Sequence, residues 1–279
     1  MAERFDVAVV GSLHLDIMVK GPRLPMLDET VMGGEWGFKC GGKGGNQAVA
    51  AAKARARTAF VGRVGEDDFG KRLLAHLSAV GVDTTRIVTD PLQGSGMSVA
   101  IETAEGAYGA VVVSGANHHI LPLQFQGLEA RVLLLQNEIA ASTTLTAAKA
   151  FKRNGTVIVH NMAPVVAVDQ QLLAITDVIV ANRVEAEGLT GEKDMEKAAR
   201  LIAQSGVAAI VTMGENGCWV AEKRRPPLHV PAFEVDVVST HGAGDVFCGT
   251  LAAELSRGKT LEDAAETASQ AAAKVVSGG

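Results

Sequence analysis

The sequence predicts an α/β protein built on a doubly wound, mostly parallel sheet, with a small second β-sheet attached. Short runs of β-branched residues alternate along the chain with alanine-rich stretches of helical period, a pattern typical of helices covering a parallel sheet. The 31 glycines and an aromatic content of only 4% suit tight turns and closely packed helices of small residues. Two segments break this rhythm and predict the second sheet.

The candidate strands are apolar on both faces, as strands buried inside a parallel sheet are. In chain order they cover residues 7–10, 111–113, 132–135, 157–159, 178–180, 209–212 and 218–221. The stretches between them carry apolar residues at helical spacing. The predicted helices cover residues 46–53, 69–79, 142–152, 183–190, 195–204, 243–257 and 261–276.

The two segments without a helical period contain prolines, glycines and alternating patterns, as in residues 98–102 and 107–114. We interpret them as a β-sheet that packs as a lid. The expected domains are therefore an α/β nucleotide- and substrate-binding body and a β lid inserted into it. The body comprises residues 1–12, 37–94 and 115–279, and the lid comprises residues 13–36 and 95–114.

Composition excludes several classes of protein. The net charge is −5, so no global basic field points to nucleic acid or to an anionic membrane. The three cysteines, Cys40, Cys218 and Cys248, lack the spacing of a zinc site or a disulfide framework. The N-terminus has no signal-peptide pattern, and no apolar run reaches the ~18 residues of a membrane-spanning helix. We expect a cytoplasmic protein that binds neither nucleic acid nor membrane.

The first chemical motif is the run Gly-Gly-Lys-Gly-Gly-Asn at residues 41–46, before an alanine-rich helix. Glycines expose backbone N–H groups and allow a ligand to approach closely, while Lys43 and Asn46 could add side-chain donors. Residues 37–43 fit the GxxxxGK pattern of a phosphate-binding loop. Gly44 stands where that loop needs a Mg²⁺-binding hydroxyl, so this interpretation fails. A tight turn before a helix is the simpler alternative.

The second motif, residues 239–245, opens another predicted helix. Gly242, Ala243 and Gly244 would gather N–H groups at the helix N-terminus, which suits the charge that develops on a transferring phosphoryl group. Asp245 could take the proton of a substrate hydroxyl as that hydroxyl attacks phosphorus. A helix cap is the commoner role for an isolated aspartate.

Two further signals are weaker on their own. Asn182 and Glu185 lie three apart at a helix start, where an amide and a carboxylate could hold water ligands of Mg²⁺ and nucleotide phosphates. Taken alone, these two residues are better explained as a helix cap with Glu at the third position. Asp16, after the first strand, could bind a pair of sugar hydroxyls, and an exposed loop aspartate is the default alternative.

Together the motifs resemble the ribokinase-like (PfkB) carbohydrate kinase family over nearly the whole chain. Residues 41–46 and 240–245 are similar to its two signatures. Further matches in family order are Asp16, Glu29, Thr30 and residues 115–117, 136–138, 161–164, 182–185, 187–191 and 212–217. The resemblance implies a Rossmann-like body and a β lid that also forms a homodimer. It implies ATP and Mg²⁺ as cofactors and phosphorylation of a primary hydroxyl of a pentose sugar, typically O5 of ribose.

The resemblance also implies roles for individual residues. Asp245 would be the catalytic base, beside an anion hole formed by Gly242, Ala243 and Gly244. The sugar contacts would be Asp16, Gly42, Lys43, Asn46 and Glu138. The nucleotide contacts would be Asn182, Thr212, Gly214 and Gly217, with Glu185 completing the Mg²⁺–phosphate pair with Asn182.

The chain departs from the family pattern near the predicted site. Ser239 stands where the family usually has an aspartate that helps hold a monovalent cation. The chain also stops before the family's usual cation-binding loop and final helix, so a requirement for K⁺ is doubtful. His14 replaces a common asparagine near the sugar, which leaves the specificity for ribose open.

Alternative functions follow from the same residues. A nucleoside kinase of the same family would stack a base on aromatic lid residues, and Trp36, Phe38 and Tyr108 are those available. A catalytically weak sugar-binding regulator on the same fold would fit the altered cation site, but the intact Asp245 argues against it. A nicotinamide oxidoreductase is disfavoured because no GxGxxG follows the first strand.

Overall fold

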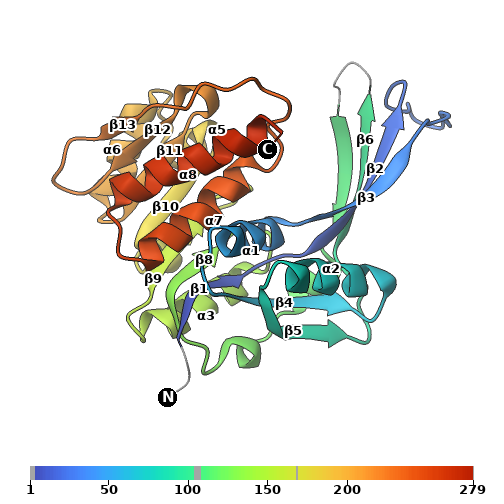
Figure 1. The fold of residues 1–279 in the computed structure, drawn as a ribbon, viewed down its shortest axis with the longest axis horizontal. Coiled ribbons are helices and arrows are strands. Elements are labelled where there is room, and N and C mark those ends of the chain that lie inside the picture. Colours follow the sequence, from blue (N-terminus) through green and yellow to red (C-terminus); the bar gives the residue numbers. More distant parts are fainter. Residues whose placement is uncertain (1–3, 104–107, 168, 279) are drawn as a thin grey trace.

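The computed structural model describes residues 4–103, 108–167 and 169–278 (Figure 1). A nine-stranded sheet forms the centre of the larger part, and a separate four-stranded sheet projects from one side of it. The predicted fold class, a mostly parallel α/β sheet with a second small β-sheet, is therefore confirmed. In spatial order the large sheet contains β13 (Leu228–Val230), β12 (Cys218–Ala221), β11 (Ala208–Thr212), β10 (Val178–Asn182), β9 (Val157–Asn161), β8 (Ala130–Leu135), β1 (Phe5–Val10), β4 (Thr58–Gly65) and β5 (Asp83–Asp90).

Helices cover both faces of the large sheet (Figure 1). They are α1 (Lys43–Lys53), α2 (Asp68–Ala79), α3 (Ala141–Lys152), α4 (Gln170–Leu173), α5 (Arg183–Thr190), α6 (Met195–Gln204), α7 (Ala243–Ser256) and α8 (Leu261–Val276). Val7 and Val9 of β1 pack in one core with α1, α2, α7 and α8. Ala8 and Val10 pack in a second core with α3 and α4. This alternation follows from the two-residue period of a strand.

Strand order reverses at the centre of the large sheet. The chain runs from β1 outward to β4 and β5, then crosses back to β8 and continues through β9 and β10 to β11. These strands are all parallel, so their carboxyl ends lie at one edge. Ligands of open α/β sheets bind in the crevice at such a reversal, outside the carboxyl ends of the strands. The crevice predicted here lies between the ends of β1 and β8.

The second sheet consists of β3 (Trp36–Gly41), β2 (His14–Gly21), β6 (Met97–Thr103) and β7 (Tyr108–Val113), in that spatial order. It is connected to the large sheet through β1, which leads into β2, and through β3, which leads into α1. Its two faces differ. Ile17 lies beside Phe38 and Val99 on an apolar face, whereas Asp16 lies beside Ser98 on the other face. Asp16 is thereby carried close to the glycine motif that starts α1.

The structure corrects the assignment of two predicted strands. Residues 111–113 were expected to form a buried parallel strand, but they belong to β7, an antiparallel edge strand with Val111 69% exposed. Residues 218–221 form β12, which is antiparallel to β11. A parallel crossover needs a dozen or more residues, and only Gly214–Asn216 and its flanks separate these two strands. Apolar composition alone does not specify strand direction.

Other boundaries also differ from expectation. The elements α4, β4, β5 and β13 were not predicted. Residues 37–41, expected in the body, pair with β2 as part of the second sheet. Residues 104–107 of the expected lid, the last of which begins a predicted strand, lie outside the described residues, as do residues 1–3, 168 and 279 of the expected body. The bounds of α5, α6 and α8 coincide with the predicted ranges.

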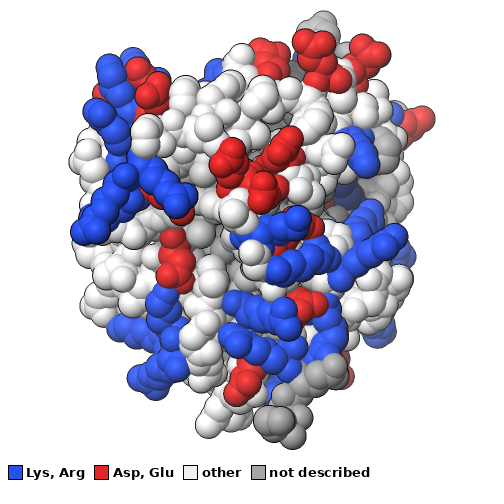
Figure 2. Space-filling view, turned by 60° about the vertical axis from the view of Figure 1, so that its left-hand side comes forward, with Lys and Arg blue, Asp and Glu red and all other residues white. Residues whose placement is uncertain are grey.

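Charged side chains of both signs share the surface. Figure 2 shows Lys and Arg side chains lying next to Asp and Glu side chains over the face that it presents. Exposed ion pairs such as Lys71–Asp68 and Lys20–Glu35 are examples of this mixing. Within the described ranges, no helix combines the length and the apolar character that crossing a bilayer requires.

Candidate active site

Asp245 lies in the first turn of α7, directly after a glycine turn. Gly242 is the N-cap residue and has a φ of 85°, a left-handed conformation that glycine adopts without strain. A Cβ atom built on Gly242 or on Gly244 would meet no atom of the described residues within 4 Å. Packing within the protein therefore does not require these glycines. They leave open space at a helix N-terminus, where an anion is favoured.

Amide side chains hold the Asp245 carboxylate in place. Asn46 Nδ2 donates to Asp245 Oδ2 at 2.9 Å, and Gln47 Nε2 donates to Oδ1 at 3.0 Å. Gln47 also donates to Asn161 Oδ1 at 3.0 Å, and its own Oε1 accepts from Gln136 Nε2 at 2.7 Å. A polar chain thus runs from the ends of β8 and β9 through α1 to α7. Four elements fix the position of one buried carboxylate.

Close packing of α7 against α1 makes these contacts possible. A Cβ atom on Gly249 would lie 2.3 Å from the Gln47 carbonyl oxygen and 2.6 Å from Ala50 Cβ. Gly249 is one helical turn after Asp245 and therefore lies on the same face of α7. Because glycine has no side chain, α7 and α1 can approach each other closely near the contact between Asp245 and Asn46.

Burial dominates the electrostatics of Asp245. Asp245 is 9% exposed, and the burial of its carboxylate raises its pKa above the usual value for aspartate. The positive charge of Lys43 and the hydrogen bonds from Asn46 and Gln47 act in the opposite direction. A carboxylate whose pKa is raised by burial and that lies near a lysine is suited to accept a proton.

This environment predicts the acid side of the pH–rate profile. Below the pKa of Asp245 the carboxyl is protonated and cannot accept a proton, so kcat/KM should rise with pH through that pKa. The midpoint should lie above the ~3.9 of an ordinary aspartate. Asn46→Ala removes a bond that lowers the pKa, so the midpoint should move further up. Ser98→Ala, which touches Asp16 instead, should leave the midpoint in place. An unmoved midpoint in Asn46→Ala assigns the titration to another group.

The glycine motif of α1 packs against the segment between β1 and β2. A Cβ atom on Gly42 would lie 2.9 Å from the backbone nitrogen of His14, and one on Gly44 would lie 2.7 Å from that of Ser12. Glu138 Oε2 accepts from Lys43 N at 2.8 Å and from Ser12 Oγ at 2.5 Å. Close packing therefore explains why residues 42 and 44 are glycines. The expected sugar contacts Gly42, Lys43 and Glu138 lie together.

Asp16 and His14 point to the same face of β2, because they are two residues apart. Asp16 Oδ1 accepts from Ser98 Oγ at 2.5 Å. His14 is buried, its burial lowers the pKa of the imidazole, and Nε2 has no hydrogen-bond partner in the described structure. The negative charges of Glu138 and Asp16, two of the expected sugar contacts, act against this lowering of the His14 pKa, so the ring lies within electrostatic reach of both.

Asn182 and Glu185 form a reciprocal cap at the start of α5. Asn182 Oδ1 accepts from Glu185 N at 3.0 Å, and the Asn182 backbone N–H donates to Glu185 Oε2 at 2.8 Å. The structure therefore contains the helix cap that was the simpler interpretation of these two residues. Burial raises the pKa of Glu185, while the Asn182 backbone hydrogen bond and the charge of Lys43 lower it. The same lysine acts on Asp245, so the two carboxylates face one cation.

The residues available here fit Mg²⁺ better than a metal held by protein ligands alone. In the described part of the chain, no three His, Cys, Asp or Glu side chains gather as a metal site. The carboxylate of Glu185 accepts one hydrogen bond at each oxygen and keeps lone pairs for water. Mg²⁺ usually retains several waters and binds one or two carboxylates together with substrate phosphates.

The expected nucleotide contacts lie at the carboxyl end of β11. Thr212 is the register partner of Asn182 in the neighbouring strand. Gly214 and Gly217 shape the turn into β12, with φ values of 61° and 77°. In the described structure, none of these residues forms a hydrogen bond with Asp245. Ser239 Oγ accepts from the His241 backbone N–H at 3.2 Å, and this hydrogen bond stabilises the turn before α7.

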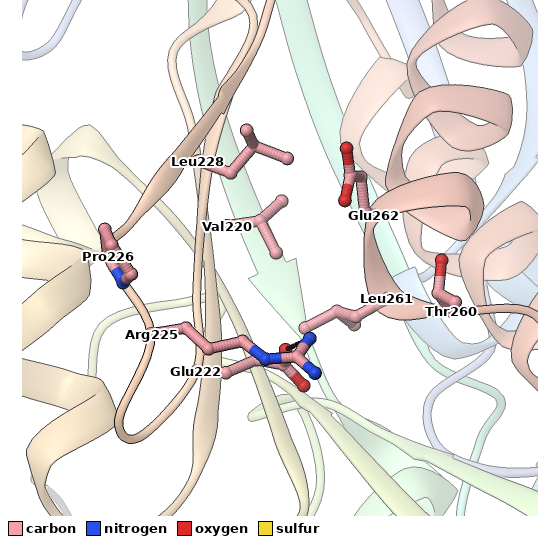
Figure 3. Close-up of a pocket in the computed structure, with 8 residues that line it drawn as sticks. All are labelled: Val220, Glu222, Arg225, Pro226, Leu228, Thr260, Leu261 and Glu262. Carbon is pink, nitrogen blue, oxygen red and sulfur yellow. Dashed lines mark hydrogen bonds and ion pairs between the residues drawn. The ribbon is translucent and has the colours of Figure 1, made fainter.

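A cavity of about 460 Å³ lies away from this edge of the sheet (Figure 3). Val220 and Leu261 line it, and an ion pair joins Arg225 to Glu222 at 2.9 Å. Because β12 is antiparallel, its end at Ala221 lies beside the amino end of β11. The cavity is therefore at the opposite end of the sheet from the strand termini that carry the candidate active site.

Sequence reasoning did not assign roles to Gln47, Gln136 and Asn161. Gln47 lies inside a predicted helix, and Gln136 and Asn161 come after predicted strands, but their partners lie 89 to 198 residues away in the chain. Amide side chains that directly follow buried parallel strands, as Gln136 does, are the signal that could have found them.

Comparisons with known proteins agree with this geometry. A family model described as pfkB family carbohydrate kinase matches residues 4–279. The ribokinase of Haemophilus influenzae is 33% identical, with 97% of this chain and 92% of that protein covered. A deoxyribokinase of Salmonella typhi is also 33% identical, covering 88% and 84%. The solved Arabidopsis thaliana ribokinase, complexed with ribose and ATP, matches with a TM-score of 0.90 and 29% identity, covering 98% and 93%.

Proposed function

Since the chain belongs to the pfkB family of carbohydrate kinases, we propose that it transfers the γ-phosphoryl group of ATP to a primary hydroxyl of a pentose. Ribose is the proposed substrate and ribose 5-phosphate the product. The observation that carries this proposal is the buried Asp245, held by Asn46 and Gln47 beside an open glycine turn at the start of α7. The similarity to proteins named ribokinase supports the choice of sugar.

The proposed reaction is an in-line transfer in which Asp245 acts as general base. Its carboxylate accepts the proton of the sugar hydroxyl, and that oxygen forms a bond to the γ-phosphorus of ATP. The bond from this phosphorus to the bridging oxygen breaks, and ADP leaves with its electron pair. Backbone N–H groups of Gly242, Ala243 and Gly244 stabilise the charge on the transferring group.

The sugar binds on the Asp16 side of the second sheet in this proposal. Asp16, Gly42, Lys43, Asn46 and Glu138 orient its hydroxyls, and the second sheet acts as a lid that excludes water from the transfer. Lys43 lies within electrostatic reach of both Asp245 and Glu185. It can therefore stabilise negative charge between the sugar and the phosphates.

Nucleotide binding uses the carboxyl ends of β10 and β11. Thr212, Gly214 and Gly217 contact ATP, and Asn182 with Glu185 holds water ligands of Mg²⁺. When bound, Mg²⁺ neutralises phosphate charge and helps to position the γ-phosphoryl group. The capping geometry supports this role, because it orients the Glu185 carboxylate before any ligand arrives.

A coupled ADP-release assay with Mg²⁺·ATP tests the function. The panel comprises ribose, 2-deoxyribose, other pentoses, hexoses and nucleosides, each with and without K⁺. Ribose should show the highest kcat/KM. 2-Deoxyribose is the second candidate, because the deoxyribokinase relative is as similar as the ribokinase relative. Turnover of a nucleoside or a hexose with ribose inactive contradicts the proposal.

We also propose that the chain forms a homodimer through the apolar face of the second sheet. Phe38 and Val99 flank Ile17 on this face, and Val111 is the register partner of Val99. Val111 is 69% exposed and Trp36 is 67% exposed. A contiguous apolar face of this kind on a projecting sheet is typical of an interaction surface. A second copy offers a matching apolar face in an isologous dimer.

Val111→Lys should convert this dimer to a monomer, because two buried lysines would face each other or lose their hydration at the interface. Light scattering at a fixed protein concentration measures the mass. Ala110→Lys is the matched control, since the adjacent residue points to the opposite face of β7. A monomeric wild-type chain, or a dimer that survives Val111→Lys, contradicts this interface.

A further inference from the structure

A second cavity, of about 250 Å³, lies on the opposite face of the large sheet from Asp245. It sits at the carboxyl ends of β8 and β9, against α3 and α4. Gln136 and Glu138 contact α1, whereas Asn137 and Ile139, which alternate with them, line this cavity. Further lining residues are Thr144, His160, Met162, Leu172 and Leu173. The cavity is therefore separate from the proposed kinase site.

His160 is the polar group best placed to recognise a ligand in this cavity. It is 5% exposed, and its Nε2 lies 2.8 Å from Asn137 Oδ1. Asn137 Nδ2 donates to the Pro164 carbonyl oxygen at 2.9 Å, so Oδ1 is the accepting atom of this amide. His160 Nε2 therefore carries the hydrogen, and Nδ1 is left as an acceptor. Within the described residues, His160 Nδ1 accepts no hydrogen bond.

The surroundings favour a neutral ligand. Burial lowers the pKa of His160 to about 4, so the ring is uncharged at neutral pH. No Lys or Arg lines the cavity in the described structure. Asp169, at the rim, uses its carboxylate to cap α4 by accepting from Gln171 N and Leu172 N. An anion would find no cation here, and the walls offer mainly apolar contact.

We propose that this cavity binds a small neutral molecule with a compact apolar body and a single O–H or N–H donor. The donor meets His160 Nδ1, and the body packs on Ile139, Met162 and Leu172. The volume is below the ~300–1,000 Å³ of sites for drug-sized ligands, so the ligand is of the size of an aromatic or branched alcohol. This site is additional to the sugar and nucleotide sites.

Calorimetric titration of the full chain with phenol tests the proposal. Phenol supplies an apolar ring and one O–H donor. Anisole has the same ring but no donor, and benzoate carries a negative charge. Phenol should bind saturably, and anisole and benzoate should each bind at least about tenfold more weakly, because one hydrogen bond contributes roughly a factor of ten. Absence of saturable phenol binding, or anisole binding as tightly as phenol, overturns the proposal.

A matched pair of variants locates the binding. Ala141 lines the mouth of the cavity at the exposed start of α3, so Ala141→Trp should block entry and remove phenol binding. Ser142 is the next residue, is also exposed and does not line the cavity, so Ser142→Trp should bind phenol like the wild type. Circular dichroism melting checks that both variants fold. Wild-type phenol affinity in a folded Ala141→Trp variant places the ligand elsewhere and overturns the assignment.

Discussion

Asp245→Asn should reduce kcat for ribose by about 10²-fold to 10⁴-fold while the ribose Kd changes by no more than a few-fold. An amide has nearly the shape of a carboxylate but cannot accept a proton from the sugar hydroxyl. Its oxygen can still accept one of the two hydrogen bonds that Asn46 and Gln47 donate to Asp245. Steady-state kinetics measure kcat, and calorimetry measures the ribose Kd.

Asp16→Asn is the matched control for this substitution. It makes the same chemical change at a carboxylate that is proposed to bind sugar and not to take the proton. The expected result is a higher KM for ribose with a much smaller loss of kcat. If Asp245→Asn keeps the wild-type kcat, Asp245 is not the base, and another group must accept the proton.

Gly249→Ala should lower the free energy of unfolding by about 1–3 kcal/mol and reduce kcat as well. The added Cβ would lie 2.3 Å from the Gln47 carbonyl oxygen, so α7 must move away from α1. Alanine favours a helix over glycine by only ~1 kcal/mol, which does not offset such a clash. A displacement of about 1 Å at Asp245 can reduce the rate by about 10²-fold. Urea denaturation and ribose kinetics measure the two effects.

Gly244→Ala is the matched control on the same helix. Among the described residues, no atom lies within 4 Å of a Cβ atom built at this position, so stability should stay constant or rise slightly. Its methyl group should still reduce turnover, because it enters the space proposed for the phosphoryl group. Equal unfolding free energies for Gly249→Ala and Gly244→Ala would contradict the close contact between α1 and α7.

Local patterns predicted seven of the eight α-helices that the structure describes, all except the short α4, and most of the buried strands. α5, α6 and α8 carry clear helical periods and end near Gly191, Ser205 and Ser277, so their bounds could be predicted closely. β5 was missed because Asp83–Asp90 is largely polar and reads as a loop. β4 was missed although it is buried, since it carries glycine within the strand at Gly62. Whether such segments form strands depends on pairing with strands that are far away in the chain.

The candidate site was predictable only where motifs are local. The two glycine motifs and Asp245 could be singled out from the sequence, but Gln47 could not be assigned its contact with Asp245, 198 residues away. The function expected for Gly42 and Gly44 was exposure of N–H groups, and the structure adds a packing role against the segment after β1. Side-chain contacts between distant elements have no local signature.

The position of the new phosphate on the sugar tests the central claim most directly. The product of ribose and Mg²⁺·ATP can be examined by phosphorus–proton correlation NMR. If Asp245 activates the primary hydroxyl, the sugar phosphorus should couple to the two protons on C5, as in ribose 5-phosphate. Coupling to the C1 proton, or ADP formation without any sugar phosphate, would contradict the proposed transfer.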